Sequence, residues 1–110
     1  MTGAPVVPSA DAVLGALGDA TRRSLLEAVA ESGPLTPTEL AGPAGISRQA
    51  VSKHLAVLEQ AGLVEAERVG REARYVVVPG SLRPATAWMD RVGAAWDRRL
   101  SRLRRHLAEH

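Results

Sequence analysis

The sequence predicts a mainly α-helical fold that carries one small antiparallel β-hairpin. Helix-capping residues and apolar residues at spacings of three and four recur along most of the 110-residue chain, as in packed helices. Residues 63–78 instead hold two extended runs that flank a Gly70-Arg71 step, which favours a hairpin. The chain has only one tyrosine, two tryptophans and no phenylalanine, so leucine, valine and alanine must build the core, which favours helices.

Capping signals in the first part of the chain predict three helices. They cover residues 9–17, residues 20–31 and a short segment that begins after Thr36. Asp19 is a good N-cap for the second helix. Thr36 suits the N-cap of the third, because Pro37 fits the first helical position and Glu39 completes a capping box. The Gly42-Pro43 step disfavours continuation of that helix, so we expect it to be short.

The fourth predicted helix carries the pattern that is most informative about function. It follows a tight turn at Gly45 and covers residues 48–61, with Ser47 as its N-cap. Apolar residues recur at spacings of four and three and share one face: Val51, Leu55 and Leu58. Hydrogen-bonding and cationic residues fall on another face: Arg48, Gln49, Ser52 and Lys53. Such a helix is suited to lie in the major groove of DNA and to read base edges there.

A hairpin and a long helix complete the predicted fold. The two strands cover residues 63–69 and 72–78. Ser81 is the expected N-cap of the last helix, which reaches about residue 108. Its apolar residues step by three and four and form one stripe: Met89, Val92, Trp96, Leu100, Leu103 and Leu107.

Composition narrows the class of protein. Residues 1–8 hold two prolines and no periodic pattern, so they are predicted to be a flexible N-terminal arm, and residues 9–110 to form a single domain. The absence of cysteine excludes disulfides, thiolate metal sites and thiol redox sensing. No apolar run approaches the roughly 18 residues of a membrane span, so a soluble cytoplasmic protein is predicted. No catalytic constellation and no Gly-rich phosphate loop occurs, so neither an enzyme nor a cofactor is predicted.

Several residues beside the fourth helix are also predicted to contact DNA. The net charge of +2 says little by itself, so the prediction depends on local placement. Threonines at the start of the third helix are first of all capping residues, although free N–H groups at a helix N-terminus also suit a phosphate. His54 is either a packed histidine or a phosphate contact, and arginines near the hairpin either reach the minor groove and its phosphates or only keep the surface soluble. Strand alternation groups Arg68 with Glu72 and Arg74 on related faces, but the turn between the strands perturbs this grouping. The predicted DNA-binding set is Thr36, Thr38, Ser47, Arg48, Gln49, Ser52, Lys53, His54, Arg68, Arg71 and Arg74.

These motifs, in this order, resemble the ArsR-type family of bacterial winged-helix repressors. The matching segments are residues 17–23 (LGDATRR), 35–41 (LTPTELA), 47–55 (SRQAVSKHL), 61–64 (AGLV) and the hairpin from Gly70-Arg71 to Tyr75. The resemblance covers roughly residues 12–108 and is most specific in the fourth helix with the Ala-Gly-Leu-Val that follows it. It implies a winged helix-turn-helix fold, a homodimer formed by the first and last helices, and autoregulated operator binding.

Many members of this family sense metal ions, and here the sequence departs from them. The family's metal site on the third helix uses cysteines, which this chain lacks. Its site on the last helix needs an aspartate and a histidine, followed by a second histidine with a carboxylate or histidine. His106 and Glu109 fit the second half, but Gly93 and Ala95 stand where the first two ligands are needed. The chain therefore resembles the branch that does not sense metals, and no metal site is predicted.

The last helix, over about residues 81–108, is predicted to form most of a dimer interface. With about 25 residues it is too long for a domain of this size to cover alone, which favours burial against a second copy over ordinary core packing. The predicted interface residues are Leu14, Leu17, Trp88, Met89, Val92, Trp96, Leu100, Leu103 and Leu107. A dimer would place two recognition helices about one DNA turn apart, which matches a palindrome.

Together these features predict a sequence-specific DNA-binding transcriptional regulator, most simply a homodimeric repressor that occupies a palindromic promoter site and joins the nucleoid when bound. Its partners are double-stranded DNA and a second copy, with no membrane, and the sequence identifies no effector. A winged-helix module that binds only proteins is one alternative, but it has no need of the polar front at Arg48, Gln49 and Lys53. A ligand-responsive activator is another, which operator position would distinguish.

Overall fold

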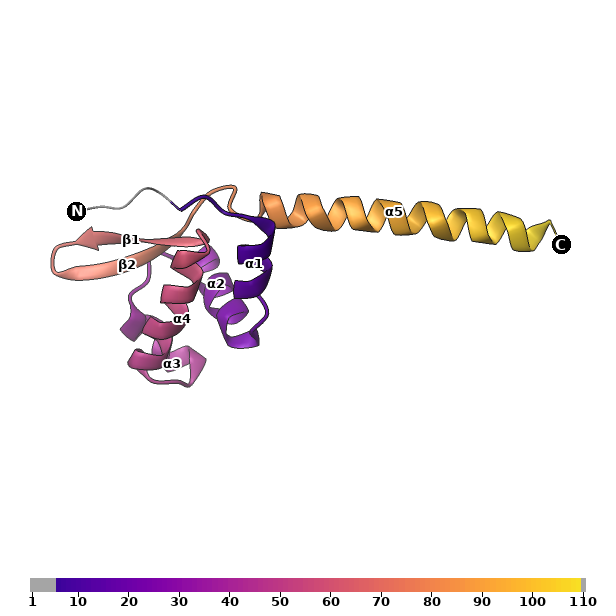
Figure 1. Cartoon of the computed structure of the whole chain (residues 1–110). Coiled ribbons are helices and arrows are strands. Elements are labelled where there is room, and N and C mark those ends of the chain that lie inside the picture. Colours follow the sequence, from indigo (N-terminus) through magenta and orange to yellow (C-terminus); the bar gives the residue numbers. More distant parts are fainter. Residues whose placement is uncertain (1–5, 110) are drawn as a thin grey trace.

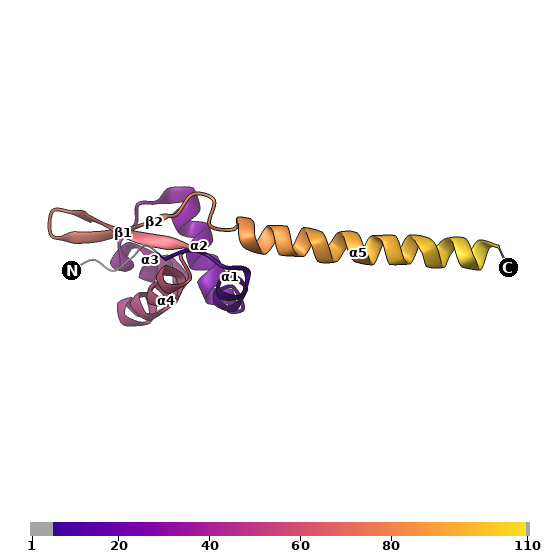
Figure 2. The same cartoon turned by 45° about the horizontal axis from the view of Figure 1, so that its top comes forward.

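The structure, a computed structural model, describes residues 6–109 and shows the predicted order of elements. These are α1 (Ala10–Ala16), α2 (Ala20–Ser32), α3 (Pro37–Ala44), α4 (Arg48–Gln60), β1 (Val64–Val69), β2 (Glu72–Val77) and α5 (Arg83–Ala108). Helices α1 to α4 and the hairpin form one body, and α5 projects from it as a single rod (Figures 1 and 2). The fold class predicted from the sequence, a mainly α winged helix-turn-helix, is confirmed.

Local capping chemistry sets where the first four helices begin. Each N-cap side chain accepts a hydrogen bond of 3.1 Å from the backbone N–H three residues further on. These N-caps are Ser9, Asp19, Thr36 and Ser47. The capping box of α3 is complete, because Glu39 Oε1 also accepts from the Thr36 N–H at 3.0 Å. The predicted starts are therefore correct to within a residue.

Two helix boundaries differ from the sequence predictions. The third helix is short, as predicted, with eight residues, but it continues past the Gly42-Pro43 step and ends at Gly45, whose φ is 69°. Proline removes one hydrogen bond there, and the left-handed glycine ends the helix two residues later. The expected cap at Ser81 is wrong, because the N-cap of α5 is Leu82, with no side-chain hydrogen bond. Ser81 is buried instead, and its hydroxyl has no hydrogen-bond partner among the described residues.

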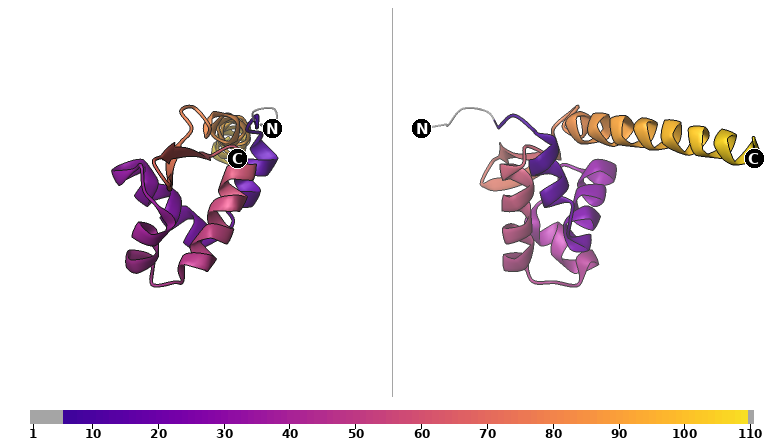
Figure 3. Two further views of the ribbon diagram at one scale, coloured as in Figure 1. Left: turned by 90° about the vertical axis from the view of Figure 1, so that its left-hand side faces the viewer. Right: turned by 45° about the vertical axis from the view of Figure 1, so that its right-hand side comes forward.

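The core lies between α1, α2, α4 and the start of β1. Its fully buried side chains are leucine and valine, as the composition requires: Val13, Leu25, Val51, Leu55, Leu58, Leu63 and Val64. From α5 only Ala85 is buried, where the helix starts beside α1. The view along α5 in Figure 3 shows that helix at one edge of the body rather than in its centre.

The hairpin is held to the body by more than its own turn. Gly70 has a φ of 64° at the first turn position, and the register pairs Val69 with Glu72 and Arg68 with Ala73. Because paired residues share a face, Arg68 lies on the face opposite Glu72 and Arg74, and the prediction that grouped the three is wrong. A single bridge between Leu35 and Tyr75, with hydrogen bonds of 3.2 and 2.8 Å, joins β2 to the segment before α3.

The described N-terminal segment is held to the body through Pro8. Residues 1–5 of the predicted flexible arm lie outside the described residues. Pro8, at the end of that arm, packs against Gly62, where a Cβ atom would lie 3.1 Å from the proline Cγ. No helix in residues 6–109 is long and apolar enough to cross a membrane.

Candidate nucleic-acid interface

Helix α4 presents two chemically different faces. Its back is formed by residues with no exposed surface: Val51, Leu55 and Leu58. Its front is exposed: Arg48, Gln49, Ser52 and Lys53. Only the turn 45–47 joins α4 to α3, so the two helices form a helix-turn-helix pair that leaves this front uncovered. The side chains predicted to read bases are therefore accessible together on one surface.

A polar cleft of about 640 Å³ lies between the start of α3, the start of α4 and the hairpin. It brings together six of the predicted DNA-binding residues, which come from segments far apart in the chain: Thr36, Thr38, Arg48, Arg68, Arg71 and Arg74. Four of these are arginines, so the cleft concentrates positive charge beside the exposed front of α4. The start of α3 borders the same cleft, but its capping box already binds the N–H groups of Thr36 and Glu39, and Pro37 has no N–H group.

Two carboxylates in this cleft were not predicted as part of the site, and both bind Arg74. Its Nη1 lies 3.0 Å from Glu39 Oε1, and its Nη2 lies 2.7 Å from Glu72 Oε2. The hydrogen bond to Glu72 raises the pKa of the Arg74 guanidinium, to which the charge of Glu39 adds. Arg74 thus ties β2 to the start of α3. Strand alternation offered one signal for this, because residues 72 and 74 share a face.

The predicted contacts Ser47 and His54 do not line this cleft. Ser47 is exposed, although its hydroxyl is engaged in capping α4. His54 is half-buried near Asp19, the N-cap of α2. The backbone hydrogen bond from Arg22 lowers the pKa of Asp19, and the nearby His54 lowers it further. Both interpretations of His54, a packed residue and a phosphate contact, are compatible with this position.

The predicted dimer interface divides into an exposed and a covered part. Along α5 the stripe is open to solvent, with Trp96 59% and Leu107 66% exposed. The other large apolar residues that are at least two-fifths exposed on this helix are Trp88, Met89, Val92 and Leu103, while Leu100 is half-buried. Leu14 on α1 and Leu17 at its C-cap are half-buried and pack against the core of their own chain. The uncovered apolar surface therefore belongs mainly to α5.

Comparison with known proteins places this arrangement in a family. A family model described as a helix-turn-helix domain matches residues 17–67, which include α2, α3 and α4. The HTH-type transcriptional regulator Rv2034 of Mycobacterium tuberculosis is 40% identical over 93 residues, which cover 84% of this chain and 83% of that protein. The transcriptional repressor SdpR of Bacillus subtilis is 31% identical over 77 residues, which cover 70% of this chain and 84% of the repressor.

Solved structures give the same assignment. An ArsR-like transcriptional regulator from Rhodococcus sp. RHA1 superposes with a TM-score of 0.74 and 38% identity, covering 87% of this chain and 90% of that one. The homodimeric winged helix-turn-helix DNA-binding domain of a possible ArsR-family regulator from Mycobacterium bovis superposes with a TM-score of 0.59 and 25% identity, covering 79% and 77%. The chain belongs to the ArsR family of winged helix-turn-helix transcriptional regulators, and it is a DNA-binding regulator of transcription.

Proposed function

We propose that the protein is a homodimeric repressor that binds a palindromic operator and excludes RNA polymerase from the promoter it occupies. The observation that carries this proposal is the cleft between α3, α4 and the hairpin, which joins six predicted contacts to the exposed front of α4. A protein-interaction module would not need four arginines converging beside a recognition helix. The protein acts in the cytoplasm on the chromosome and needs no catalytic activity.

Each part of the interface has a distinct role in this proposal. Arg48 or Gln49 reads a base through two hydrogen bonds, arginine preferring guanine and glutamine preferring adenine. Ser52 and Lys53 contact base edges or phosphates. The phosphate contacts around them come from the start of α3, from α4 and its cap and from the hairpin: Thr36, Thr38, Ser47, His54, Arg68 and Arg71. Arg74 holds the hairpin against α3 and contributes its charge to the cleft.

The second copy packs against the exposed stripe of α5. Support comes from the M. bovis homologue, whose domain is homodimeric, and from the apolar side chains that a single chain leaves in solvent. Support for repression comes from the name of the B. subtilis relative, a transcriptional repressor. Release does not depend on a metal ion, since the chain has no cysteine and has Gly93 and Ala95 where the family's last-helix site needs ligands.

The proposal is tested by measuring fluorescence anisotropy on the promoter region upstream of the gene for this protein. Replacing Arg48 or Gln49 by alanine should cost about 1–3 kcal/mol of operator binding and relax sequence preference. Replacing Arg71 should weaken binding to all sequences alike and lower the salt slope by about one. Arg104→Ala removes the same charge from an exposed position on α5 and is the matched control.

Three outcomes would contradict parts of this assignment. Unchanged affinity in the Arg48 and Gln49 variants would show that the front of α4 is not the reading face. If unrelated competitor DNA abolished the operator complex, the binding would be due to phosphate attraction alone and would not be sequence-specific. A shift in operator affinity with zinc chloride or EDTA would show that metal sensing was wrongly excluded.

A further inference from the structure

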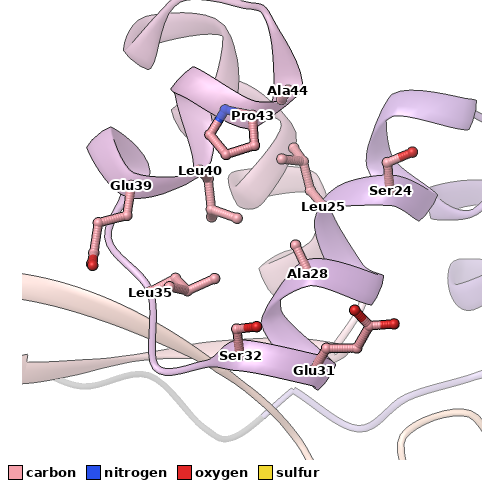
Figure 4. Close-up of a pocket in the computed structure, with 10 residues that line it drawn as sticks. All are labelled: Ser24, Leu25, Ala28, Glu31, Ser32, Leu35, Glu39, Leu40, Pro43 and Ala44. Carbon is pink, nitrogen blue, oxygen red and sulfur yellow. The ribbon is translucent and has the colours of Figure 1, made fainter.

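A second cavity lies on the side of the body, between α2, α3 and the segment that joins them. Its volume is about 380 Å³, within the range of about 300–1,000 Å³ that small-molecule sites occupy. Its inner wall is apolar and is formed by Leu25 and Ala28 from α2, Leu35 from the connecting segment and Leu40 from α3. Figure 4 shows these four side chains gathered around the cavity. None of its lining residues comes from α1, α4 or α5, so neither the proposed reading face nor the dimer stripe covers it.

Two carboxylates stand on opposite sides of this apolar wall, Glu31 and Glu39 (Figure 4). Glu31 is exposed and forms no ion pair with any residue between 6 and 109. It lies in the last turn of α2, where the helix dipole is negative and which holds no basic residue. The helix end and the side chain therefore add up to an uncompensated negative region at one side of the pocket.

Only one of the two carboxylate oxygens of Glu39 accepts hydrogen bonds from the described neighbouring residues. The hydrogen bonds recorded between residues 6 and 109 all go to Oε1, which accepts from the Thr36 N–H at 3.0 Å and from Arg74 Nη1 at 3.0 Å. The backbone hydrogen bond from Thr36 lowers the pKa of the Glu39 carboxyl, so the group is ionised at neutral pH. Its Oε2 is therefore open to a further donor, and Glu39 is one of the residues that line the pocket.

We propose that this pocket binds a small organic cation, an amine with a compact hydrocarbon body, and that the amine is an effector that weakens operator binding. The hydrocarbon part would cover the leucine wall, and the ammonium group would meet the Glu39 carboxylate, while Glu31 on the opposite side adds to the negative potential of the pocket. An anion or a second phosphate contact is disfavoured by the same two carboxylates. The effector role, unlike the site itself, rests on the proposed operator binding.

The link to DNA binding passes through Glu39, which lines both this pocket and the cationic cleft. An ammonium group at Oε2 would share the negative charge of Glu39 and would thereby weaken the ion pair of Glu39 Oε1 with Arg74. The hairpin would then lose one of its ties to the start of α3, and the cleft would lose the arrangement in which its phosphate donors converge. By linkage, an amine that weakens operator binding must itself bind less tightly to the operator complex.

The site is tested first without DNA, by isothermal titration calorimetry with phenethylamine as the probe. The amine should bind, while 2-phenylethanol and phenylacetate, which share its ring but lack its charge, should not. Glu31→Gln and Glu39→Gln should each weaken binding severalfold, and the second variant keeps the capping box because glutamine also fills that role. Arg74→Gln should tighten binding, since it removes the competing cation.

Glu27→Gln is the matched control, because Glu27 is exposed on the same helix but does not line the pocket. Equal effects of Glu27→Gln and Glu31→Gln, or equal binding of the amine and the alcohol, would overturn the site. The effector role is tested by operator anisotropy at saturating phenethylamine, compared with ammonium chloride at the same ionic strength. Operator affinity should fall about fivefold, the lower end of usual allosteric couplings.

These measurements separate the two proposals. Failure to bind the operator without any amine would refute the proposed function and leave the calorimetric result standing. Amine binding with unchanged operator affinity would refute the effector role alone.

Discussion

At the scale of single residues, Glu39 joins the start of α3 to the hairpin, whereas the sequence pattern around it predicts only its role in the capping box. One oxygen accepts the backbone N–H of Thr36, which caps α3, and the guanidinium of Arg74, which comes from β2. The capping hydrogen bond joins residues that are three positions apart in the sequence, and the ion pair joins residues that are thirty-five positions apart. A substitution at this position therefore changes both the start of α3 and the attachment of the hairpin.

The titration of Glu39 predicts how stability depends on pH. Its folded pKa lies below the ordinary value of 4.5, chiefly because of the Thr36 hydrogen bond. A lowered folded pKa means that the ionised carboxylate stabilises the fold above about pH 4.5, and that this contribution is lost as pH falls through the folded pKa. Glu39→Gln keeps the cap but does not titrate, so wild type should be the more stable protein at neutral pH.

Urea unfolding of both proteins from about pH 6 to about pH 3 measures this difference, because titrations common to both cancel. The advantage of wild type should be constant at the upper end and shrink towards the lower end. A difference in stability that does not change with pH would show that the charge of Glu39 contributes nothing and that only its shape as a capping residue matters.

At the scale of elements, the sequence was informative wherever the cause was local. Capping residues act on N–H groups three positions away, so the starts of the first four helices could be predicted from neighbouring residues. Pro43 was misleading, because one lost hydrogen bond near the end of a helix is tolerated. Ser81 was misleading because tertiary packing buries it, so it does not cap α5. Leu82 occupies the N-cap position instead.

Contacts between distant segments could not be predicted in the same way. The bridge between Leu35 and Tyr75 and the pairing of Arg74 with Glu39 depend on how the hairpin folds back onto α3. The hydrophobic pattern indicated which residues of the candidate site are exposed, whereas the cleft that gathers them arises only from the tertiary arrangement.

The turn between α3 and α4 gives a prediction about elements. Gly45 has a φ of 69°, so an alanine there is strained even though no atom lies within 4 Å of the added Cβ. Gly45→Ala should cost about 1 kcal/mol of folding free energy. Gly15→Ala adds the same methyl group to a helical position in α1 that is equally open, and it should stabilise the fold by about 0.5–1 kcal/mol.

Thermal and urea unfolding at one fixed protein concentration compare these two variants. Opposite signs are expected from the same chemical change, because φ alone differs between the sites. Destabilisation by both substitutions would mean that the Gly15 surface is covered in solution, for instance by a second copy against α1.

At the scale of the whole molecule, the protein is a small body with a long helix that its own core hardly uses. The chain extends 70 Å in its longest dimension, and the only buried residue of α5 is Ala85, near the start of the helix. The solvent-exposed stripe of α5 includes two tryptophans. It exposes far more apolar surface than a helix of a monomeric protein usually does. The length of α5 therefore has a physical reason only if another apolar surface packs against it.

Trp96 tests this reasoning because it lies in the middle of the stripe and is 59% exposed in the single chain. Trp96→Ala removes little from the core of one protomer, so each copy should keep its fold. If Trp96 is an anchor of the dimer, its loss should raise the dissociation constant by about thirtyfold or more, which corresponds to about 2 kcal/mol. Sedimentation equilibrium measures this change, and Asp97→Ala, one residue further along the exposed helix, should leave it unaltered.

The same variant connects assembly to operator recognition. Two α4 helices can occupy successive major grooves only when α5 holds them at a fixed separation of about one DNA turn. Trp96→Ala should therefore lose affinity for a full palindrome while its weak affinity for a single half-site is unchanged. An operator affinity that survives monomerisation would show that one winged helix is sufficient, and it would remove the palindrome from the proposed function.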